Sequence, residues 1–435
     1  MRLDILEEHA GEAMFLFEHR RRALTSLVLR RDFLREIDER LTAHLDGLTL
    51  ARAAGWEVAA ALLDAEEPAG PFVATAVALI GVPPGALEHI ERALIAVEPP
   101  AFAAMSSALG LWPQALVAGS DRAVRWLERP EPRLRAAGIT AFGAGGRPPP
   151  VAALARVLED GASDATLLSA ALHAAGRMGD RQLSLAATRL VAHPDAGVRA
   201  AALQAALLLT GAGARELSRE RLAVDEDRSV AAHVLGFVGE PADAASLASA
   251  LAGAAPSVER SILLALGNLG WADGIDPLLA AAGGDGVRAR LAGFALARML
   301  GEGRDWQRRP PASNAPAAPG GAHAGGDAQD ADSERWTPDD ELPLWSVEPI
   351  AAAAKAARAQ LGAGQRLRNG RAWVAGALTP APALGVEADE ALEAALATPG
   401  SRVRDVAALD VRAPFAWRAV APAPAPALAA RSQRA

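Results

Sequence analysis

Cysteine and tyrosine are absent from this 435-residue sequence, and aromatic residues make up only 4% of it. Without cysteine the chain can form no disulfide, no thiolate metal site and no cysteine nucleophile, and this composition suits a reducing compartment. Lysine is almost absent too, because the 44 basic residues include a single lysine, Lys355. We interpret this arginine bias as a consequence of genomic base composition rather than as a sign of an arginine-specific function.

An excess of positive charge is also lacking. The formal net charge is −8, and residues 1–127, 128–303 and 304–435 carry net charges of −6, −2 and 0. Binding to a phosphate backbone requires a basic surface, which none of these segments provides. The sequence therefore argues against nucleic acid as a partner.

Long apolar runs are missing as well. No stretch reaches about 18 apolar residues without a charge or a Pro/Gly break, so we expect no membrane span. The first eight residues are acidic and lack the basic segment, apolar centre and cleavage site of a secretory signal. We therefore expect a cytoplasmic protein.

Apolar residues nevertheless make up 51% of the chain, and most of them are alanine and leucine. Alanine has the highest helix propensity and lets helices pack closely, so we predict an all-α fold. Six Ala/Leu-rich runs each end on a glycine. These runs are Leu134–Gly143, Leu167–Gly179, Val198–Gly211, Val230–Gly239, Ser257–Gly270 and Val287–Gly301.

The closing glycines are 36, 32, 28, 31 and 31 residues apart. A period of about 30 residues with two helical runs per unit is typical of an α-solenoid of HEAT-like repeats. We assign the repeats to residues 128–303. Residues 1–127 are predicted to be an N-terminal helical region.

The N-terminal region is predicted to begin with an antiparallel helical hairpin. Residues 3–29 form its first amphipathic helix, and residues 32–54 form its second, with Asp32 as the N-cap and Gly55 after the end. The apolar stripe of the second helix is Leu34, Ile37, Leu41, Leu45 and Leu48. Of the shorter segments that follow, Phe72–Val82 could be a buried strand, but its alanine content favours a helix.

The C-terminal third changes character. Residues 304–344 are rich in Pro, Gly, Ala and Asp and have too few large apolar groups to offset the entropy of ordering, which predicts a low-complexity linker or insertion. Tryptophans flank this segment and are expected to fix its ends. They are Trp306, Trp336 and Trp345. Residues 345–420 are predicted to form a C-terminal helical region, with helices at 349–361 and 387–397, and residues 421–435 a flexible tail.

Acidic and basic residues recur at the start of several repeat helices. An acidic residue in this position caps free backbone amides and complements the helix dipole. We interpret these residues as a ladder that holds the repeats together, with partner binding as the alternative. The ladder consists of Asp195, Arg199, Asp227, Arg228, Asp285 and Arg288.

The N-terminal hairpin has the densest set of polar residues. Its antiparallel arrangement would bring the arginines at the end of the first helix toward acidic residues at the start of the second. The simplest interpretation is a structural clasp, and the sharper alternative is a partner-binding site. The residues concerned are His19, Arg20, Asp38, Arg40, His44 and Asp46.

Signals of catalysis are weak. The sequence has no zincin motif, no nucleophile elbow and no phosphate loop. Acidic residues cluster at 225–227 and 339–341, but both clusters are expected in solvated turns or linker, where their pKa values stay ordinary. We therefore assign no catalytic, cofactor-binding or metal-binding residue and expect neither a cofactor nor an enzyme.

Several short stretches of the chain resemble a known family. The N-terminal stretches are Glu8-His9, Phe15–Arg20, Leu34, Ile37–Leu41, Ala43–Leu48 and Ala54–Trp56, and the C-terminal ones are Gly364–Arg366 and Pro399–Pro414. Together they resemble a proteobacterial family of uncharacterised HEAT-repeat proteins often encoded near type VI secretion genes. The resemblance implies a fold and a genomic setting but no reaction.

These observations favour a non-catalytic scaffold or adaptor that binds a protein, and the expected partner is a component or effector of a secretion system. Two alternatives stay open. One is an enzyme on a HEAT scaffold, of lyase or glycosylase type, although the charge balance argues against a DNA glycosylase. The other is an immunity protein that neutralises a toxin.

Overall fold

A computed structural model describes most of the chain as helices. The described residues are 2–24, 26–29, 31–81, 83–112, 116, 122–144, 149–160, 164–303, 306–308, 338–360, 365–368 and 371–372. They confirm the all-α class, with one short antiparallel pair, β1 (Leu367–Arg368) and β2 (Arg371–Ala372), as the only strands among them. Within these residues no helix is both long enough and apolar enough to cross a bilayer.

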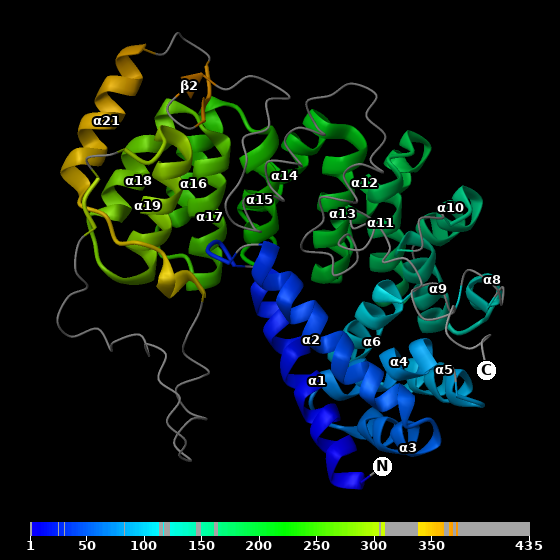
Figure 1. The fold of residues 1–435 in the computed structure, drawn as a ribbon. Helices are drawn as coiled ribbons and strands as arrows, with labels where there is room; N and C mark the ends of the chain where they lie inside the picture. The colour runs from blue at the N-terminus through cyan, green and yellow to red at the C-terminus, as the bar shows by residue number, and fades with distance from the viewer. Residues whose placement is uncertain are drawn as a thin grey trace, which may run out of the picture. The chain divides into compact units, whose positions relative to one another are not determined.

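Two compact units make up the chain, and their described parts are residues 2–24 with 36–149, and 26–35 with 150–372. Buried apolar residues such as Phe72 and Met105 form the core of the first unit. The unit is built from helices (Figure 1). They are α1 (Leu3–Leu24), α2 (Arg31–Leu50), α3 (Ala53–Ala61), α4 (Ala69–Gly81), α5 (Ala86–Ala96), α6 (Pro99–Leu111), α8 (Arg122–Leu127) and α9 (Pro132–Ala144). Segment 72–82 is therefore helical, as expected, through residue 81. Helix α4 lies at the centre, because it packs against α1, α3, α5 and α6.

The helices α1 and α2 run antiparallel, which confirms the N-terminal hairpin. His9 near the start of α1 lies beside His44 near the end of α2, and Arg20 lies beside Asp38. All five residues of the predicted apolar stripe on α2 are buried. On α1 the ring of Phe17 stacks on Phe72 with 3.8 Å between ring centroids, which joins the hairpin to α4.

The ends of these two helices differ from the prediction. Helix α1 stops at Leu24 because the Ser26 hydroxyl accepts hydrogen bonds from the amides of Val28 and Leu29 and forms a local turn. Asp32 lies inside α2 rather than before it. Gly55 does not end α2. It lies inside α3, where an added Cβ would be 1.9 Å from the carbonyl oxygen of Leu48.

The second unit contains most helices of the predicted repeats. They are α10 (Val151–Asp160), α11 (Ala165–Met178), α12 (Ser184–Arg189), α13 (Ala196–Thr210), α14 (Ala214–Leu222), α15 (Arg228–Val238), α16 (Pro241–Leu251), α17 (Pro256–Leu269), α18 (Ile275–Ala282) and α19 (Gly286–Leu300). Five of the six predicted glycine-terminated runs correspond to α11, α13, α15, α17 and α19. The sixth, 134–143, corresponds to α9 and belongs to the first unit.

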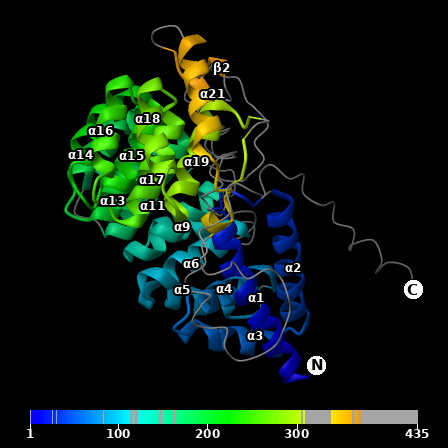
Figure 2. The same ribbon diagram turned by 90° about the vertical axis from the view of Figure 1, so that its left-hand side faces the viewer.

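These helices alternate between two roles. Every second helix packs against the next one of the same set, in the order α11, α13, α15, α17 and α19. These five helices appear in this order from right to left in Figure 1. Helices α12, α14, α16 and α18 each pack against the helix that follows them in sequence. Figure 2 shows α14, α16 and α18 on the same side of the second unit. The second unit is thus a succession of helix pairs.

Small residues set the spacing between successive helices. A Cβ added to Gly176 would lie 3.2 Å from Ala205 Cα, one added to Gly236 would lie 3.0 Å from Ala265 Cα, and one added to Gly267 would lie 3.0 Å from Ala295 Cα. In each case a glycine on one helix faces an alanine on the next. Two helices can approach this closely only where side chains are this small.

The predicted closing glycines have more than one physical role. Gly179 and Gly270 end their helices in the left-handed conformation, and Gly211 and Gly301 also have positive φ. Gly239 instead has φ −69°, and an added Cβ would be 2.8 Å from Leu269 Cδ1. At that position glycine allows a close approach rather than an unusual φ.

The two ends of the low-complexity segment are held together. Trp306 and Trp345 are buried and meet edge to face with 5.7 Å between ring centroids, and the amide of Ser346 donates to the carbonyl of Gln307. Helix α21 (Val347–Gln360) follows and packs on α18 and α19. Trp336, the predicted helix at 387–397 and the tail at 421–435 lie outside the described residues.

We expect Gly267→Ala to destabilise the protein by about 1–3 kcal/mol, because the added methyl group cannot be accommodated against Ala295 without separating α17 from α19. Gly11→Ala is the matched control. Gly11 lies within α1 with no atom within 4 Å of an added Cβ, so alanine should stabilise the helix by up to about 1 kcal/mol. Urea unfolding of both variants checks this, and equal effects would contradict the proposed role of the close contact.

Candidate functional site

The predicted ladder has one fully formed link, between α13 and α15. Arg199 Nε donates to both carboxylate oxygens of Asp227 at 2.9 Å, and its Nη2 donates to Glu226 at 2.7 Å. Its Nη1 donates to the carbonyl oxygens of His193 and Pro194. Asp227 is fully buried, so this guanidinium supplies the opposite charge and the hydrogen bonds that a buried carboxylate requires.

The other ladder residues have different roles. Asp195 is the N-cap of α13 and accepts from the amide of Val198 at 2.9 Å, and Asp285 is the N-cap residue of α19. Arg228 donates to the carbonyl oxygen of Leu222 and pairs with Asp225 three residues earlier. Arg288 on α19 reaches α17, where it pairs with Glu259 at 3.0 Å. The ladder is therefore not a uniform repeat.

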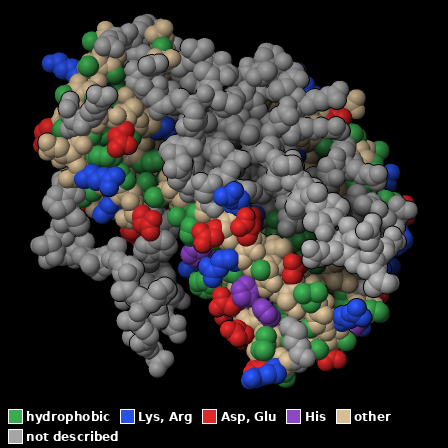
Figure 3. Space-filling model, in the orientation of Figure 1, with side chains coloured by type: hydrophobic (Ala, Val, Ile, Leu, Met, Phe, Trp, Pro, Cys, Tyr) green, Lys and Arg blue, Asp and Glu red, His purple; other side chains and the backbone are tan. Residues whose placement is uncertain are grey.

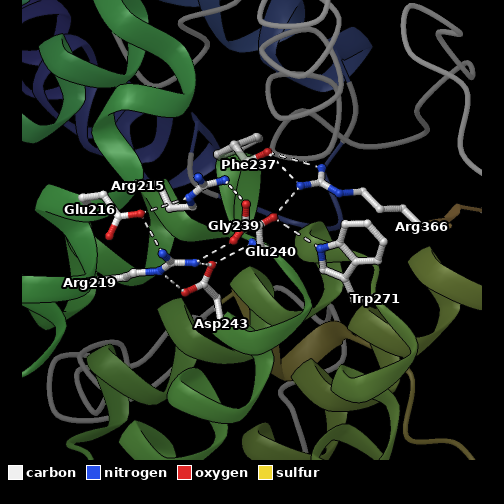
Figure 4. A network of polar contacts seen from close by, with 9 residues as sticks. All are labelled: Arg215, Glu216, Arg219, Phe237, Gly239, Glu240, Asp243, Trp271 and Arg366. Atoms are coloured by element: carbon white, nitrogen blue, oxygen red, sulfur yellow. Dashed lines mark hydrogen bonds and ion pairs between the residues drawn. The ribbon is translucent and has the colours of Figure 1, made fainter. Parts of the chain in front are cut away.

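A second ionic network, which the sequence analysis did not single out, joins α14 to α16 (Figure 4). Arg219 on α14 makes a two-pronged contact with Asp243 on α16, at 2.6 Å and 3.0 Å, and also donates to Glu216 and Glu240. Arg215 pairs with Glu240 at 2.6 Å. Hydrogen bonds to Asp243 contribute most to raising the pKa of Arg219 above its ordinary value.

Asp243 also completes the N-terminus of its own helix. Its Oδ2 accepts from the amide of Glu240 at 2.7 Å, as one half of a capping box. Glu240 and Asp243, at the N-terminus of α16, therefore each accept a hydrogen bond from a backbone amide there and also bind an arginine of α14. The signal for this network in the sequence is Arg215-x-x-x-Arg219, with one helical turn between two cations.

Arg366 and Leu367, far along the chain, bind the C-terminal ends of α15 and α17. Arg366 donates to the carbonyl oxygens of Phe237 and Gly239, and its guanidinium lies over the ring of Trp271, 5.3 Å from the centroid. Trp271 Nε1 donates to the same Gly239 carbonyl, and the amide of Leu367 donates to the carbonyl of Gly270 at 2.7 Å. A cation at the end of a helix is favoured by the helix dipole.

Two acidic clusters expected to be solvated each contain a buried member. Asp227 is 0% exposed and Asp339 is 7% exposed. Arg260 binds Asp339 through two nitrogens, at 2.6 Å and 3.2 Å. The expectation that these aspartates are free in turns was wrong. Each is buried as the partner of an arginine from another helix, which is a contact between distant parts of the chain.

The polar residues of the N-terminal hairpin are only partly brought together. Arg20, 1% exposed, donates to Asp38 at 2.7 Å, which is the clasp between the two helices. His44 lies beside His9, which the sequence did not single out as a site residue, with 3.1 Å between the two Nδ1 atoms. Arg40 and Asp46 are exposed on α2.

His19 lies beside an exposed aromatic ring. The ring of Phe15, which is 60% exposed, stacks on His19 with 5.8 Å between centroids. Partial burial, followed by the charges of Arg22 and Arg40, lowers the pKa of His19. The neutral imidazole is therefore the favoured form in the folded protein.

Within the described residues, no group of three or more His, Asp or Glu side chains converges on one point where a metal ion could sit. The buried aspartates of the second unit, Asp227, Asp243 and Asp339, are instead each paired with an arginine from another helix. Comparison with protein-family models and with curated proteins finds no match to this chain. Membership of a HEAT-repeat family therefore stays a prediction.

We expect Arg199→Met to destabilise the protein by about 3 kcal/mol, because the substitution leaves the buried Asp227 carboxylate without its main partner. Arg288→Met is the matched control from the same predicted ladder. Arg288 is half exposed, so its loss should cost no more than about 1 kcal/mol. Urea unfolding at neutral pH measures both, and similar losses for the two variants would contradict this assignment.

The lowered pKa of His19 predicts a pH dependence of stability. Below the ordinary histidine pKa of 6.5, the unfolded chain takes up a proton that the folded chain resists, so stability falls as the pH drops from 7 toward the folded pKa. His19→Gln should reduce this slope in thermal melts between about pH 7 and pH 5.5. The same slope in both proteins would contradict the prediction.

Proposed function

We propose that the second unit is an α-solenoid of HEAT-like repeats and that the protein is a non-catalytic, protein-binding scaffold. The observation that carries this proposal is the packing order of α11, α13, α15, α17 and α19, each against the next, with a shorter partner helix before each. A stack of helix pairs of this kind exposes an extended surface along its length. Such surfaces are commonly used to bind other macromolecules.

The placement of charge supports a binding role. Buried aspartates of the second unit are paired with arginines that join neighbouring helices, as at Arg199–Asp227, Arg219–Asp243 and Arg260–Asp339. These contacts stabilise the stack. The net charge of −8 favours a partner with a basic or amphipathic segment over nucleic acid.

The N-terminal hairpin is our candidate for the contact region. Phe15 offers an exposed aromatic ring that stacking on His19 holds in place, and an exposed ring of this kind is a typical anchor of a protein interface. Charged residues of α1 and α2 surround histidine side chains on the face seen in Figure 3. A cytoplasmic location and a partner from a type VI secretion system, as a component or an effector, are proposed from the composition and from the family resemblance.

The test is affinity purification of the tagged full-length chain from its own host at low salt, with partners identified by mass spectrometry. Point variants are preferable to removing residues 1–55, because Phe17 stacks on Phe72 and the deletion would open the core of the first unit. We expect Phe15→Ser to lose the partner. Leu185→Ser on α12, where the leucine is 63% exposed, should retain it.

A partner recovered in this way should then bind the purified wild-type chain and fail to bind the Phe15 variant. Retention by both variants would place the contact on another surface. Enrichment of no protein over the tag alone would argue against the scaffold proposal itself.

A further inference from the structure

Two histidines from different helices meet on the N-terminal hairpin. His9 lies on α1 and His44 on α2, and both side chains are partly exposed. Their Nδ1 atoms are 3.1 Å apart, and their rings are inclined by 66°. Each ring thus directs the same nitrogen toward one small region between the helices.

This separation fits two imidazoles that bind one metal ion. With Zn–N bonds of about 2.05 Å and a tetrahedral angle, two ligand nitrogens lie about 3.4 Å apart. A movement of a few tenths of an ångström would bring His9 and His44 to that distance. A direct hydrogen bond between the rings is the other arrangement that this geometry allows, with one Nδ1 protonated and the other accepting.

The surroundings of the pair fix one ring and supply negative charge. Gly47 lies one turn after His44, and a Cβ added there would be 2.8 Å from Nε2 of His9, so only glycine leaves room for the ring in this position. The carboxylates of Glu8 and Glu12 on α1 act electrostatically on His44 and would favour a bound cation. Arg40 on α2 acts in the opposite sense.

We propose that His9 and His44 form a binding site for one divalent transition-metal ion, such as Zn²⁺, with their two Nδ1 atoms as ligands. The protein supplies two ligands, and water or a ligand from outside the chain completes the coordination. Neutral imidazole is a preferred ligand for Zn²⁺ and its neighbours in the first transition series. This site is separate from the proposed scaffold role and stands or falls without it.

The test is titration of the full-length chain with Zn²⁺ alone, followed by isothermal calorimetry at neutral pH. We expect one Zn²⁺ per chain at sub-millimolar concentration and a melting temperature that rises with Zn²⁺ concentration. His9→Gln and His44→Gln should each weaken the affinity by about tenfold or more. His89→Gln is the control, because His89 is exposed and its Nδ1 contacts its own helix at the Gly85 carbonyl.

Gly47→Ala tests the geometry without removing a ligand. The added methyl group must displace the His9 ring, so the Zn²⁺ affinity should fall by about threefold or more. Melting curves without metal establish that each variant is folded. Equilibrium dialysis that detects no bound Zn²⁺ on the wild-type chain would overturn the proposal and leave the pair as hydrogen-bonded imidazoles. Binding that is unchanged in both His→Gln variants would overturn it as well.

Discussion

The close contact between successive helices of the second unit is the constraint on which the rest of that unit depends. Gly236 against Ala265 and Gly267 against Ala295 bring backbones near enough that even one methyl group changes the spacing. This distance fixes how far a side chain of one helix can reach toward the next. The abundance of alanine is thus a packing requirement as well as a helix preference.

Once the helices are this close, polar side chains between them must be paired. Asp227 and Asp243 are almost fully buried, and each faces an arginine on a neighbouring helix. The same carboxylates lie at helix N-termini, where an acidic group is already favoured by the helix dipole. One residue can therefore satisfy a helix end and a contact between helices together. This explains why these networks gather at the ends of helices.

In the first unit the same reasoning gives a different result. Arg20 is buried and paired with Asp38 across the hairpin, so it acts as the predicted clasp. His9 lies near the start of α1 and His44 near the end of α2, and both side chains are partly exposed. A ligand from solvent can therefore reach them, whereas the guanidinium of Arg20 in the clasp is buried. Gly47 makes that arrangement possible, because the absence of a side chain there leaves space for the ring of His9.

The sequence by itself determined the helical class, the hairpin and the positions of most helices in the predicted repeats, because apolar spacing, Ala/Leu content and closing glycines are local signals. It also placed Arg20 and Asp38 in the same predicted clasp, but only the structure shows that these two residues are the ones that pair. Only the tertiary structure decided that Asp339 is buried by Arg260, that Arg366 meets Trp271, and that His9 meets His44. The two residues of each pair are 79, 95 and 35 positions apart in the sequence, respectively. A local sequence pattern cannot specify contacts between side chains that are this far apart.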